Sequence, residues 1–534
     1  MSLLEIRELC IDVGAEQRTR VVDTVSLNVE AGRTTVLVGE SGSGKSMTAL
    51  AVVRLLPNAA RITGGEIRFA GQNLLKWPEA RMCDVRGARI GFVFQEPQTS
   101  LNPVMRIGDQ VGEVLTRHRG MRGRARDARI VELLEAVEIA DATRRMREYP
   151  HQFSGGMKQR VMVAIALAGE PDLLLADEPT TALDVSTQAQ ILELLRREQQ
   201  RRGMGMLFIT HDLAVAHQVG DELVVMRHGA VVEQGAKATI FARPTADYTR
   251  HLFAVSPRLA PDDAPTPLAV DAPALLNVRQ LSVEFARRTG LLRRAGSRIT
   301  AVNNVDLDIR IGETLAVVGE SGSGKTTLGR GILRLVPVSG GRVEFAGDDL
   351  LLLAPSALRR ARRELQVVFQ DPYASMNPRM TVREIIEEGM IAQGIGLDAA
   401  DRRTRVMQLL QQVGLDAEAM SRHPHEFSGG QRQRISIARA LAVEPRLIVC
   451  DEPTSALDVS VQAQILALLR GLQSRLGLSY LFITHNLGVV SQLAHRVAVM
   501  HRGRIVETGP TGKVLFAPEH PYTKHLLAAV PRLP

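Results

Sequence analysis

Cysteine is scarce in this 534-residue chain, which contains three: Cys10, Cys83 and Cys450. Their spacing matches no metal-binding pattern, and three are too few for a disulfide framework. We therefore exclude zinc modules and iron–sulfur domains built on clustered cysteines, and we expect a reducing compartment. Tryptophan occurs once, at Trp77, where we expect local packing.

Long apolar runs are also missing. The segment 161–169 is among the longest and is far shorter than the roughly 20 residues that cross a bilayer as a helix. The first eight residues show no basic stretch followed by an apolar core, so we expect no export signal. If the function involves a membrane, we expect other chains to span it.

The net charge of +8 is mild for this length, and ordinary solubility accounts for it. Arginine is nevertheless concentrated in two clusters: Arg117, Arg119, Arg122, Arg124, Arg126 and Arg129, and Arg287, Arg288, Arg293, Arg294 and Arg298. Either cluster could face anionic lipid headgroups or nucleic acid.

The heptapeptide Gly-Glu-Ser-Gly-Ser-Gly-Lys occurs twice, each time after an apolar strand-like run (residues 34–38 and 314–318) and before a hydroxyl residue. This is the phosphate-loop pattern, in which glycines let backbone N–H groups face phosphate oxygens beside a helix N-terminus. We therefore predict two bound nucleotides and assign these residues to binding: Gly39, Glu40, Ser41, Gly42, Ser43, Gly44, Lys45 and Ser46, and Gly319, Glu320, Ser321, Gly322, Ser323, Gly324, Lys325, Thr326 and Thr327. The lysines are predicted to reach the β- and γ-phosphates, and Ser46 and Thr326 to ligate Mg²⁺.

Hydrolysis needs a metal carboxylate and a group that activates water. Two buried strand-like segments, 173–177 and 447–451, each end in an acid that is followed by a glutamate. At the carboxyl end of a strand these groups would lie beside the phosphates. We predict that Asp177 and Asp451 serve Mg²⁺, and that Glu178 and Glu452 accept a proton from the attacking water.

The whole chain is duplicated, because Ser154, Asp177, His211 and Tyr248 recur 274 positions later as Ser428, Asp451, His485 and Tyr522. A repeat of this size indicates two domains. Between them, prolines 257, 261, 265, 267 and 273 indicate a semi-rigid exposed linker. We predict a first domain at 1–255, a linker at 256–274 and a second domain at 275–534.

Further motifs resemble those of ABC ATPases in the same order in both halves. Phe-Ser-Gly-Gly at 153–156 and 427–430 is similar to the signature motif, Gln95 and Gln370 to the Q-loop glutamine, and His211 and His485 to the switch histidine. The resemblance implies an α/β fold of two tandem P-loop NTPase domains. Each would have a parallel-sheet nucleotide core, an antiparallel β subdomain and a helical subdomain. It also implies catalytic roles for both glutamines and both histidines, with the glutamines beside the metal.

In this family the signature of one domain binds the nucleotide of the other, so the resemblance implies an intramolecular ATP sandwich. Residues 39–46 would pair with Ser428, Gly429, Gly430 and Gln431, and residues 319–326 with Ser154, Gly155 and Gly156. The residue-level alternative is that Ser154 and Ser428 simply cap the helices that follow them.

Two positions depart from the family pattern. Met157 stands where the signature usually has glutamine, which Gln431 retains. Phe285 fits the place of the aromatic side chain that stacks on adenine, whereas the aligned segment in the first half offers only Val13. We expect a weaker adenine contact in the first domain, and hydrolysis at both sites because both glutamates are present.

The segments after the Q-loops (95–103 and 370–378) and the tails (244–252 and 520–527) are similar to ATPases of dipeptide, oligopeptide, glutathione and nickel importers. The whole-chain resemblance is greatest to the microcin C type of peptide importer. It implies a peripheral ATPase on the cytoplasmic face of the bacterial inner membrane, with two permeases and a periplasmic binding protein. Ser100, Leu101, Ser375 and Met376 would lie in the permease-docking surface. The alternative is an ABC ATPase that acts on nucleic acid or the ribosome through its arginine clusters, although we expect no specific nucleic acid.

Overall fold

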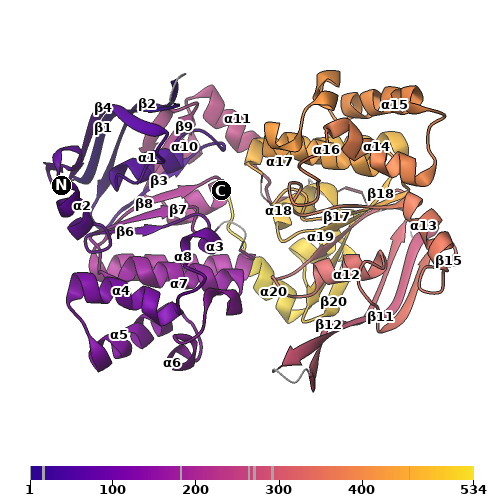
Figure 1. Ribbon diagram of the computed structural model, residues 1–534, viewed down its shortest axis with the longest axis horizontal. Coiled ribbons are helices and arrows are strands. Elements are labelled where there is room, and N and C mark those ends of the chain that lie inside the picture. Colours follow the sequence, from indigo (N-terminus) through magenta and orange to yellow (C-terminus); the bar gives the residue numbers. More distant parts are fainter. Residues whose placement is uncertain are drawn as a thin grey trace. The chain divides into compact units, whose positions relative to one another are not determined.

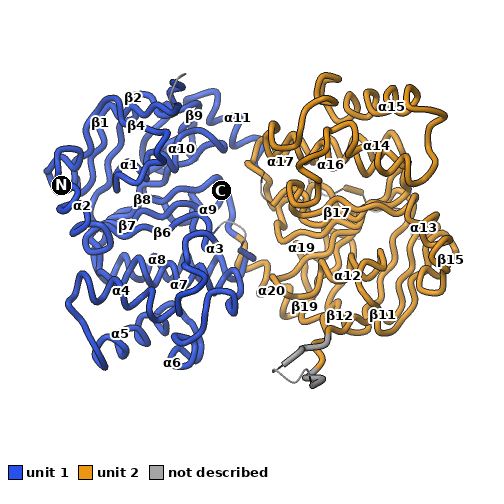
Figure 2. Tube along the Cα trace, in the orientation of Figure 1, with its two compact units in different colours: residues 1–256, 531–534 blue, residues 257–530 orange. Residues whose placement is uncertain are grey.

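The computed structural model describes residues 2–14, 18–180, 183–261, 265–266, 268, 272–289, 294–455 and 457–533. The side chains of residue 98 and of residues 286–289 and 294–297 lie outside this description. The predicted second arginine cluster is therefore described only at Arg298, because Arg287, Arg288, Arg293 and Arg294 fall on residues or side chains that are left out. The chain divides into two compact units, residues 1–256 with 531–534 and residues 257–530 (Figure 2). Each unit is described by itself.

The first unit is built around a six-stranded sheet in the order β10-β9-β3-β8-β7-β6. Strands β3, β6, β7, β8 and β9 of this sheet are parallel to one another, and β10 pairs antiparallel with β9. The central strands are buried on both faces, so their sequences are continuous apolar runs. The bounds are β3 Thr34–Val38, β6 Ile90–Val93, β7 Leu173–Asp177, β8 Gly205–Thr210, β9 Glu222–Arg227 and β10 Ala230–Ala236.

A second, antiparallel sheet in the first unit has the order β2-β1-β4-β5. Alternate side chains of its long strands point inward and pack with side chains of the parallel sheet into one apolar core. The strands are β1 Ser2–Val13, β2 Thr19–Glu30, β4 Ala60–Phe69 and β5 Gln72–Asn73.

The helices of the first unit fall into two groups (Figure 1). Helices α4, α5, α6 and α7 pack on one another as a helical subdomain, while most of the others lie against the sheets. The bounds are α1 Lys45–Val52, η1 Leu74–Lys76, α2 Glu79–Val85, α3 Pro97–Ser100, α4 Ile107–Arg119, α5 Gly123–Ala136, α6 Ala142–Arg145, η2 Pro150–Gln152, α7 Gly155–Ala168, α8 Val185–Arg202, α9 Leu213–Val219, α10 Lys237–Ala242 and α11 Asp247–Val255.

The second unit repeats this architecture, with sheet orders β16-β17-β18-β13-β19-β20 and β12-β11-β14-β15. Its strands are β11 Ala274–Thr289, β12 Arg294–Arg310, β13 Thr314–Val318, β14 Gly340–Phe345, β15 Asp348–Asp349, β16 Leu365–Val368, β17 Leu447–Asp451, β18 Ser479–Ile483, β19 Arg496–His501 and β20 Arg504–Pro510. Its helices are α12 Lys325–Ile332, α13 Pro355–Glu364, α14 Val382–Gln393, α15 Ala399–Gln412, η4 Ala417–Ser421, η5 Pro424–Glu426, α16 Gly429–Leu441, α17 Val459–Leu476, α18 Leu487–Leu493, α19 Thr511–Phe516 and α20 Pro521–Ala528. The predicted α/β fold with three subdomains per half is confirmed.

The start of the predicted linker is packed rather than free. Leu259 contacts an apolar cluster of the second unit, and Ser491 Oγ donates to the carbonyl of Arg258 at 2.8 Å. A Cβ at Gly488 would lie 3.1 Å from the carbonyl oxygen of Pro257. Residues 257–259 therefore belong structurally to the second unit, while the division at 255 and 275 stays a proposal.

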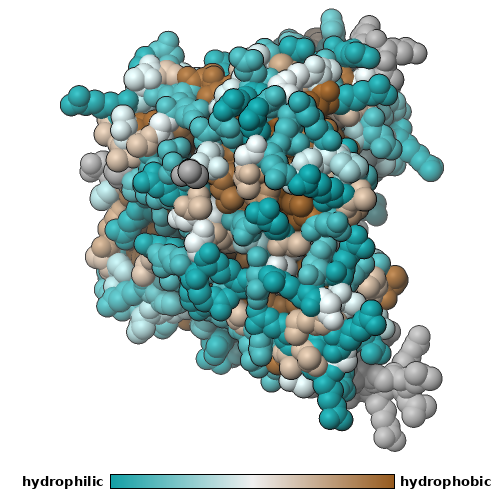
Figure 3. Space-filling view, turned by 90° about the vertical axis from the view of Figure 1, so that its left-hand side faces the viewer, coloured by the Kyte–Doolittle hydropathy of each residue, from teal (hydrophilic) through white to brown (hydrophobic). Residues whose placement is uncertain are grey.

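Hydrophilic side chains cover most of the face of the first unit shown in Figure 3, with apolar patches between them. Within the described residues no helix combines the length and apolar character needed to span a membrane. Some apolar side chains are nevertheless strongly exposed, among them Val104 of the first unit (80% exposed) and Leu352 of the second (83%).

Candidate functional site

Each phosphate loop joins the central strand of a parallel sheet, β3 or β13, to the helix that follows it. Gly44 and Gly324 cap these helices with φ angles of 96° and 106°, which side chains with a Cβ rarely adopt. A Cβ there would also lie 2.6 Å from the carbonyl oxygen of Val21 and 2.3 Å from that of Ala301. The loops can therefore press against β2 and β12 only because these residues are glycines.

The loop lysines are buried and organise the loops around their ammonium groups. Lys45 Nζ donates to the carbonyls of Gly39 and Glu40, both at 2.8 Å. Lys325 Nζ makes the equivalent bonds to Gly319 and Glu320, also at 2.8 Å. Both lysines are thus tied to the first residues of their own loops, and their contact with phosphates remains a prediction.

Two of the three predicted metal residues meet in each unit, while the third, Gln95 or Gln370, contacts the neighbouring glutamate instead. Ser46 Oγ donates to Asp177 Oδ1 at 3.0 Å, and Thr326 Oγ1 donates to Asp451 Oδ1 at 2.8 Å. Hydroxyl and carboxylate oxygens are the hard donors that Mg²⁺ prefers, so these residues fit the predicted ion. Burial raises the pKa of Asp177 to about 6 and also raises the pKa of Asp451. A cation beside either carboxylate would favour its ionised form.

The glutamate after each acidic strand is held by two side chains. Gln95 Nε2 donates to Glu178 Oε2 at 3.0 Å, and His211 Nδ1 lies 3.2 Å from Oε1. Glu452 has the same two neighbours: Gln370 Nε2 donates to Oε2 at 2.9 Å, and His485 Nδ1 lies 3.3 Å from Oε1. Six residues that are far apart in sequence are therefore brought together as two matching triads.

Both glutamates have a positive φ of 46°, which is uncommon outside glycine. The conformation coincides with the end of the strand, since β7 ends at Asp177 and β17 at Asp451. Burial opposes ionisation of Glu452, but His485 and Lys325 outweigh burial and lower its pKa. Burial likewise opposes a charge on His211, but Glu178 outweighs it and raises the pKa of the histidine. The second triad therefore favours an ionised glutamate, and the first favours a charged histidine beside Glu178.

The signature serines cap helices, as the residue-level alternative expected. Ser154 accepts from the N–H of Met157 at 3.4 Å, and Ser428 accepts from that of Gln431 at the same distance. In the second unit the Gln431 side chain also accepts from the N–H of Ser428 at 3.0 Å, which completes a capping box. The glycines of both signatures lie in the first turns of α7 and α16, and the predicted contact with nucleotide remains a prediction.

The proposed adenine positions are structurally equivalent. Phe285 pairs with Ile299, two residues before Ala301, whose carbonyl lies beside the second loop. Val13 pairs with Thr19, two residues before Val21, whose carbonyl lies beside the first loop. Phe285 is 41% exposed, so its ring is accessible for stacking.

Sequence reasoning missed one contact in each unit. The hydroxyl of Tyr248 accepts from the N–H of Glu40 at 3.3 Å, and that of Tyr522 accepts from the N–H of Glu320 at 3.2 Å. The available signal was the recurrence of these tyrosines in the register of the repeat.

Comparison with known families agrees with the geometry. The ABC transporter profile matches residues 22–181 and 302–455, one stretch in each unit. The chain belongs to the ABC transporter ATP-binding proteins. It therefore binds ATP, and its ATP hydrolysis is coupled to transport. A second profile, the C-terminal region of oligopeptide/dipeptide transporters, matches residues 232–288 and 506–534.

Relatives match this ABC protein over nearly its whole length. The ABC transporter ATP-binding protein YejF of Escherichia coli is 49% identical over 529 residues, covering 99% of each chain. The peptidoglycan transport ATP-binding protein YejF of Agrobacterium fabrum is 47% identical, covering 99% of this chain and 96% of its own. The glutathione import ATP-binding protein GsiA of Escherichia coli is 45% identical, covering 97% and 87%. The duplicated organisation is thus shared with these proteins.

Part of the predicted docking surface of this ABC protein is wrong. Leu101 is 2% exposed and Met376 is 4% exposed, so both side chains are core residues. Ser100 is exposed, and Ser375 is half-buried with its carbonyl accepting from Arg439 at 2.7 Å. The accessible apolar side chains after the Q-loops are instead Val104 (80% exposed) and Tyr373 (47%).

Most arginines of the first cluster of the ABC protein are paired with acids. Arg119 and Arg129 both contact Glu170, at 2.7 and 3.1 Å, and Arg126 contacts Asp127 at 3.1 Å. Arg298 of the second cluster lies 3.2 Å from Glu284. These pairings reduce the positive field that a nucleic-acid backbone would meet.

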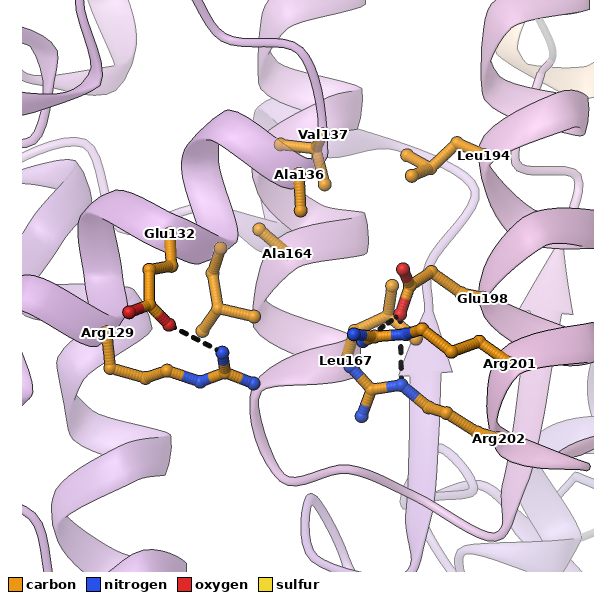
Figure 4. A pocket seen from close by; sticks show the side chains of 11 residues that line it. Arg129, Glu132, Ala136, Val137, Ala164, Leu167, Leu194, Glu198, Arg201 and Arg202 are labelled. Carbon is orange, nitrogen blue, oxygen red and sulfur yellow. Dashed lines mark hydrogen bonds and ion pairs between the residues drawn. The ribbon is translucent and has the colours of Figure 1, made fainter.

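A cavity of about 200 Å³ lies between α5, α7 and α8 of the first unit, and Figure 4 shows its wall. Its charged side chains are paired along the wall: Arg129 with Glu132 at 2.7 Å, and Arg201 and Arg202 with Glu198 at 2.7 and 2.9 Å. The residues of the nucleotide triads do not line it.

Proposed function

We propose that the chain hydrolyses ATP at two sites to drive import of peptides or peptide-like compounds. The two matched triads, each a glutamate held by a glutamine and a histidine at 2.9–3.3 Å, are the observation that carries hydrolysis at both sites. The peptide class is supported by the oligopeptide/dipeptide C-terminal region in both units and by relatives named for peptidoglycan and glutathione transport.

In this proposal Glu178 and Glu452 take the proton of the attacking water. The glutamine donates to one carboxylate oxygen while the histidine lies beside the other, so the carboxylate keeps a fixed orientation. Rotation of either partner onto water or the γ-phosphate would leave the glutamate free to accept the proton. General-base catalysis of this kind contributes about 10²–10⁴-fold to the rate.

Mg²⁺ would be held by Ser46 and Asp177 in one site and by Thr326 and Asp451 in the other, with Gln95 and Gln370 nearby. When bound, the ion would neutralise charge on the phosphates. Lys45 and Lys325 bind the same phosphates as point charges, and the loop N–H groups orient them.

We further propose that the units close on ATP head to tail. Residues 39–46 would face Ser428, Gly429, Gly430 and Gln431, and residues 319–326 would face Ser154, Gly155 and Gly156. The first turns of α7 and α16 support this, because their N–H groups and helix dipoles favour a γ-phosphate. Joining the units in one chain raises their effective concentration.

The proposed partners are two membrane permeases and, through them, a periplasmic substrate-binding protein. The chain would then act at the cytoplasmic face of the bacterial inner membrane. Val104 and Tyr373, exposed just after the Q-loops, are the residues that we propose for permease contact. A segment next to Gln95 or Gln370 would move with the triad and so transmit nucleotide state to a permease.

The test replaces Val104 and Tyr373 by glutamate, singly and together, and uses Leu352→Glu as the control. Leu352 is about as exposed as Val104, at 83% against 80%, but it lies between β15 and α13 and outside the segments that follow the Q-loops. We expect the Val104 and Tyr373 variants to keep basal ATPase activity while losing peptide uptake and recruitment to permease-containing membranes. Leu352→Glu should keep all three.

Membrane recruitment that is unchanged in the double variant, together with RNA binding that weakens steeply with salt, would favour the nucleic-acid alternative. Buried Leu101 and Met376 are unsuitable for this test because charged replacements would disrupt the core.

A further inference from the structure

The C-terminal region of each unit reaches back to its phosphate loop through one tyrosine. Tyr248 lies in the first turn of α11, and its hydroxyl accepts from the N–H of Glu40 at 3.3 Å. Tyr522 lies in the first turn of α20 and contacts Glu320 in the same way at 3.2 Å. The sequence that follows the tyrosine is nearly the same in both copies, Tyr-Thr-Arg-His-Leu at 248–252 and Tyr-Thr-Lys-His-Leu at 522–526, and the contact is repeated with it.

The turn before each tyrosine is anchored by a glutamate of the sheet. Glu233 on β10 accepts from the N–H groups of Thr245 and Ala246 at 2.7 and 3.2 Å. Glu507 on β20 accepts from those of Glu519 and His520 at 2.8 and 3.1 Å. These bonds lower the pKa of both glutamates below its usual value, although burial opposes the shift. The anchored turn therefore sets where the helix begins.

The neighbouring strand supports each ring. The guanidinium of Arg227, at the end of β9, lies 4.9 Å from the centre of the Tyr248 ring. His501, at the equivalent end of β19, has its ring centre 3.9 Å from that of Tyr522. Anchored at the backbone and supported at the ring, each hydroxyl has a defined direction.

The contact falls on a peptide group that also holds the loop lysine. The N–H of the Gly39–Glu40 peptide donates to Tyr248, while the carbonyl of the same peptide, that of Gly39, accepts from Lys45 Nζ at 2.8 Å. The Gly319–Glu320 peptide is held in the same way between Tyr522 and Lys325. Because a peptide group is planar, fixing its N–H also fixes the direction of its carbonyl and hence the place of the ammonium.

We infer that Tyr248 and Tyr522 are positioning residues, each of which holds the first turn of a phosphate loop and thereby strengthens binding of ATP phosphates. This inference rests on the proposed assignment of residues 39–46 and 319–326 as the two ATP sites. It gives the C-terminal region of each unit a direct influence on its own nucleotide site.

The test removes one hydroxyl at a time in chains with a single working site. Tyr248→Phe and Tyr522→Phe are each combined with Lys45→Ala and with Lys325→Ala, and the Kd for ATP is measured. With Lys325→Ala only the first site binds, so Tyr248→Phe should weaken ATP by about three- to tenfold and Tyr522→Phe should have no effect. With Lys45→Ala the pattern should reverse. In each single-site chain, the tyrosine substitution should raise the ATP concentration needed for half-maximal turnover more than it lowers the rate at saturating ATP.

Tyr480→Phe is the structural control, because its buried hydroxyl donates to the carbonyl of Leu469 at 3.0 Å in the core of the second unit. It should lower the melting temperature and leave ATP affinity unchanged. An unchanged Kd for ATP in the Tyr248→Phe and Tyr522→Phe variants, or equal weakening of ATP binding at both sites by either one, would overturn the inference. If Lys45→Ala and Lys325→Ala fail to remove ATP binding one site each, the site assignment itself fails.

Discussion

The two units share a fold and the same glutamate–glutamine–histidine triad but differ in other residues. The signature helix of the second unit starts with a full capping box between Ser428 and Gln431, whereas Met157 leaves the first unit with the serine bond alone. A capping box satisfies two backbone N–H groups in place of one. The comparison shows that the triad residues are duplicated, whereas the cap of the signature helix differs between the units.

A second difference lies at the start of the central strand. The N–H of Thr34 donates to Asp221 Oδ2 at 2.8 Å in the first unit, but the N–H of Thr314 donates to His495 Nδ1 at 3.0 Å in the second. A third lies at the proposed adenine position, where Val13 has the strand position in the first unit that Phe285 has in the second. The triads make the two sites alike, whereas these three differences predict unequal stability and ATP affinity.

The largest expected effect tests whether both triads work. Glu178→Gln and Glu452→Gln should each lower hydrolysis at their own site by about 10²–10⁴-fold, because each removes the proton acceptor. ATP binding should persist, since the amide keeps the shape of the carboxylate. Single-turnover hydrolysis with parallel binding measurements checks this, and a parental rate in either variant would exclude that glutamate as the base.

A smaller but site-specific effect tests the head-to-tail arrangement. A Cβ at Gly155 would have no neighbour within 4 Å, and a Cβ at Gly429 would lie 3.6 Å from Leu457, which is ordinary van der Waals contact. The Cβ of an aspartate at either position is therefore free of clashes within its own unit. Gly429→Asp should lower turnover at the first phosphate loop by about tenfold or more, because the carboxylate repels the γ-phosphate. Gly155→Asp should lower turnover at the second phosphate loop by a similar factor. Trapped-nucleotide measurements would resolve the sites, with Gly471→Asp as an open-position control. Damage to the loop of the same unit would contradict the arrangement.

The adenine contact should differ between the units by about tenfold. Phe285→Ala should weaken ATP at the second site to that extent, because stacking of a base on an aromatic ring contributes about 1–3 kcal/mol. Val13→Tyr should tighten the first site. Equilibrium binding in single-site chains measures both changes, and equal affinities that neither substitution alters would remove Phe285 from the site.

The smallest expected effect is on pH dependence. Burial lowers the pKa of His495 below 6.5, although Glu313 opposes the shift, and its ring must be neutral to accept from Thr314. As the pH falls through the unfolded value, the unfolded chain takes up a proton before the folded chain does, so stability decreases until the folded group also titrates. Calorimetric melts between about pH 7.5 and 5.5 should show this loss in the parent and less of it in His495→Asp, which copies the first unit. The same loss in both proteins would exclude His495 as its origin.

The sequence alone determined the α/β fold class, the duplication and most of the residues that meet in the candidate sites. Lys45, Asp177 and Glu178 were predictable because a phosphate loop and an acidic strand are contiguous segments whose local backbone geometry follows from glycine placement and apolar runs. Gln95 and His211 could be assigned through family resemblance, and their meeting at Glu178 follows from parallel strands that end at one edge of a sheet.

Only the tertiary structure decided which groups meet across long separations. Tyr248 contacts Glu40 from 208 residues away, and no local pattern specifies such a pair. The burial of Leu101 and Met376 could not be predicted from the sequence either. An apolar residue in a loop-like segment can face the core or the solvent, and the packing of the helical subdomain decides between them. Contacts of this kind depend on how separate elements pack, whereas motif chemistry depends on neighbours along the chain.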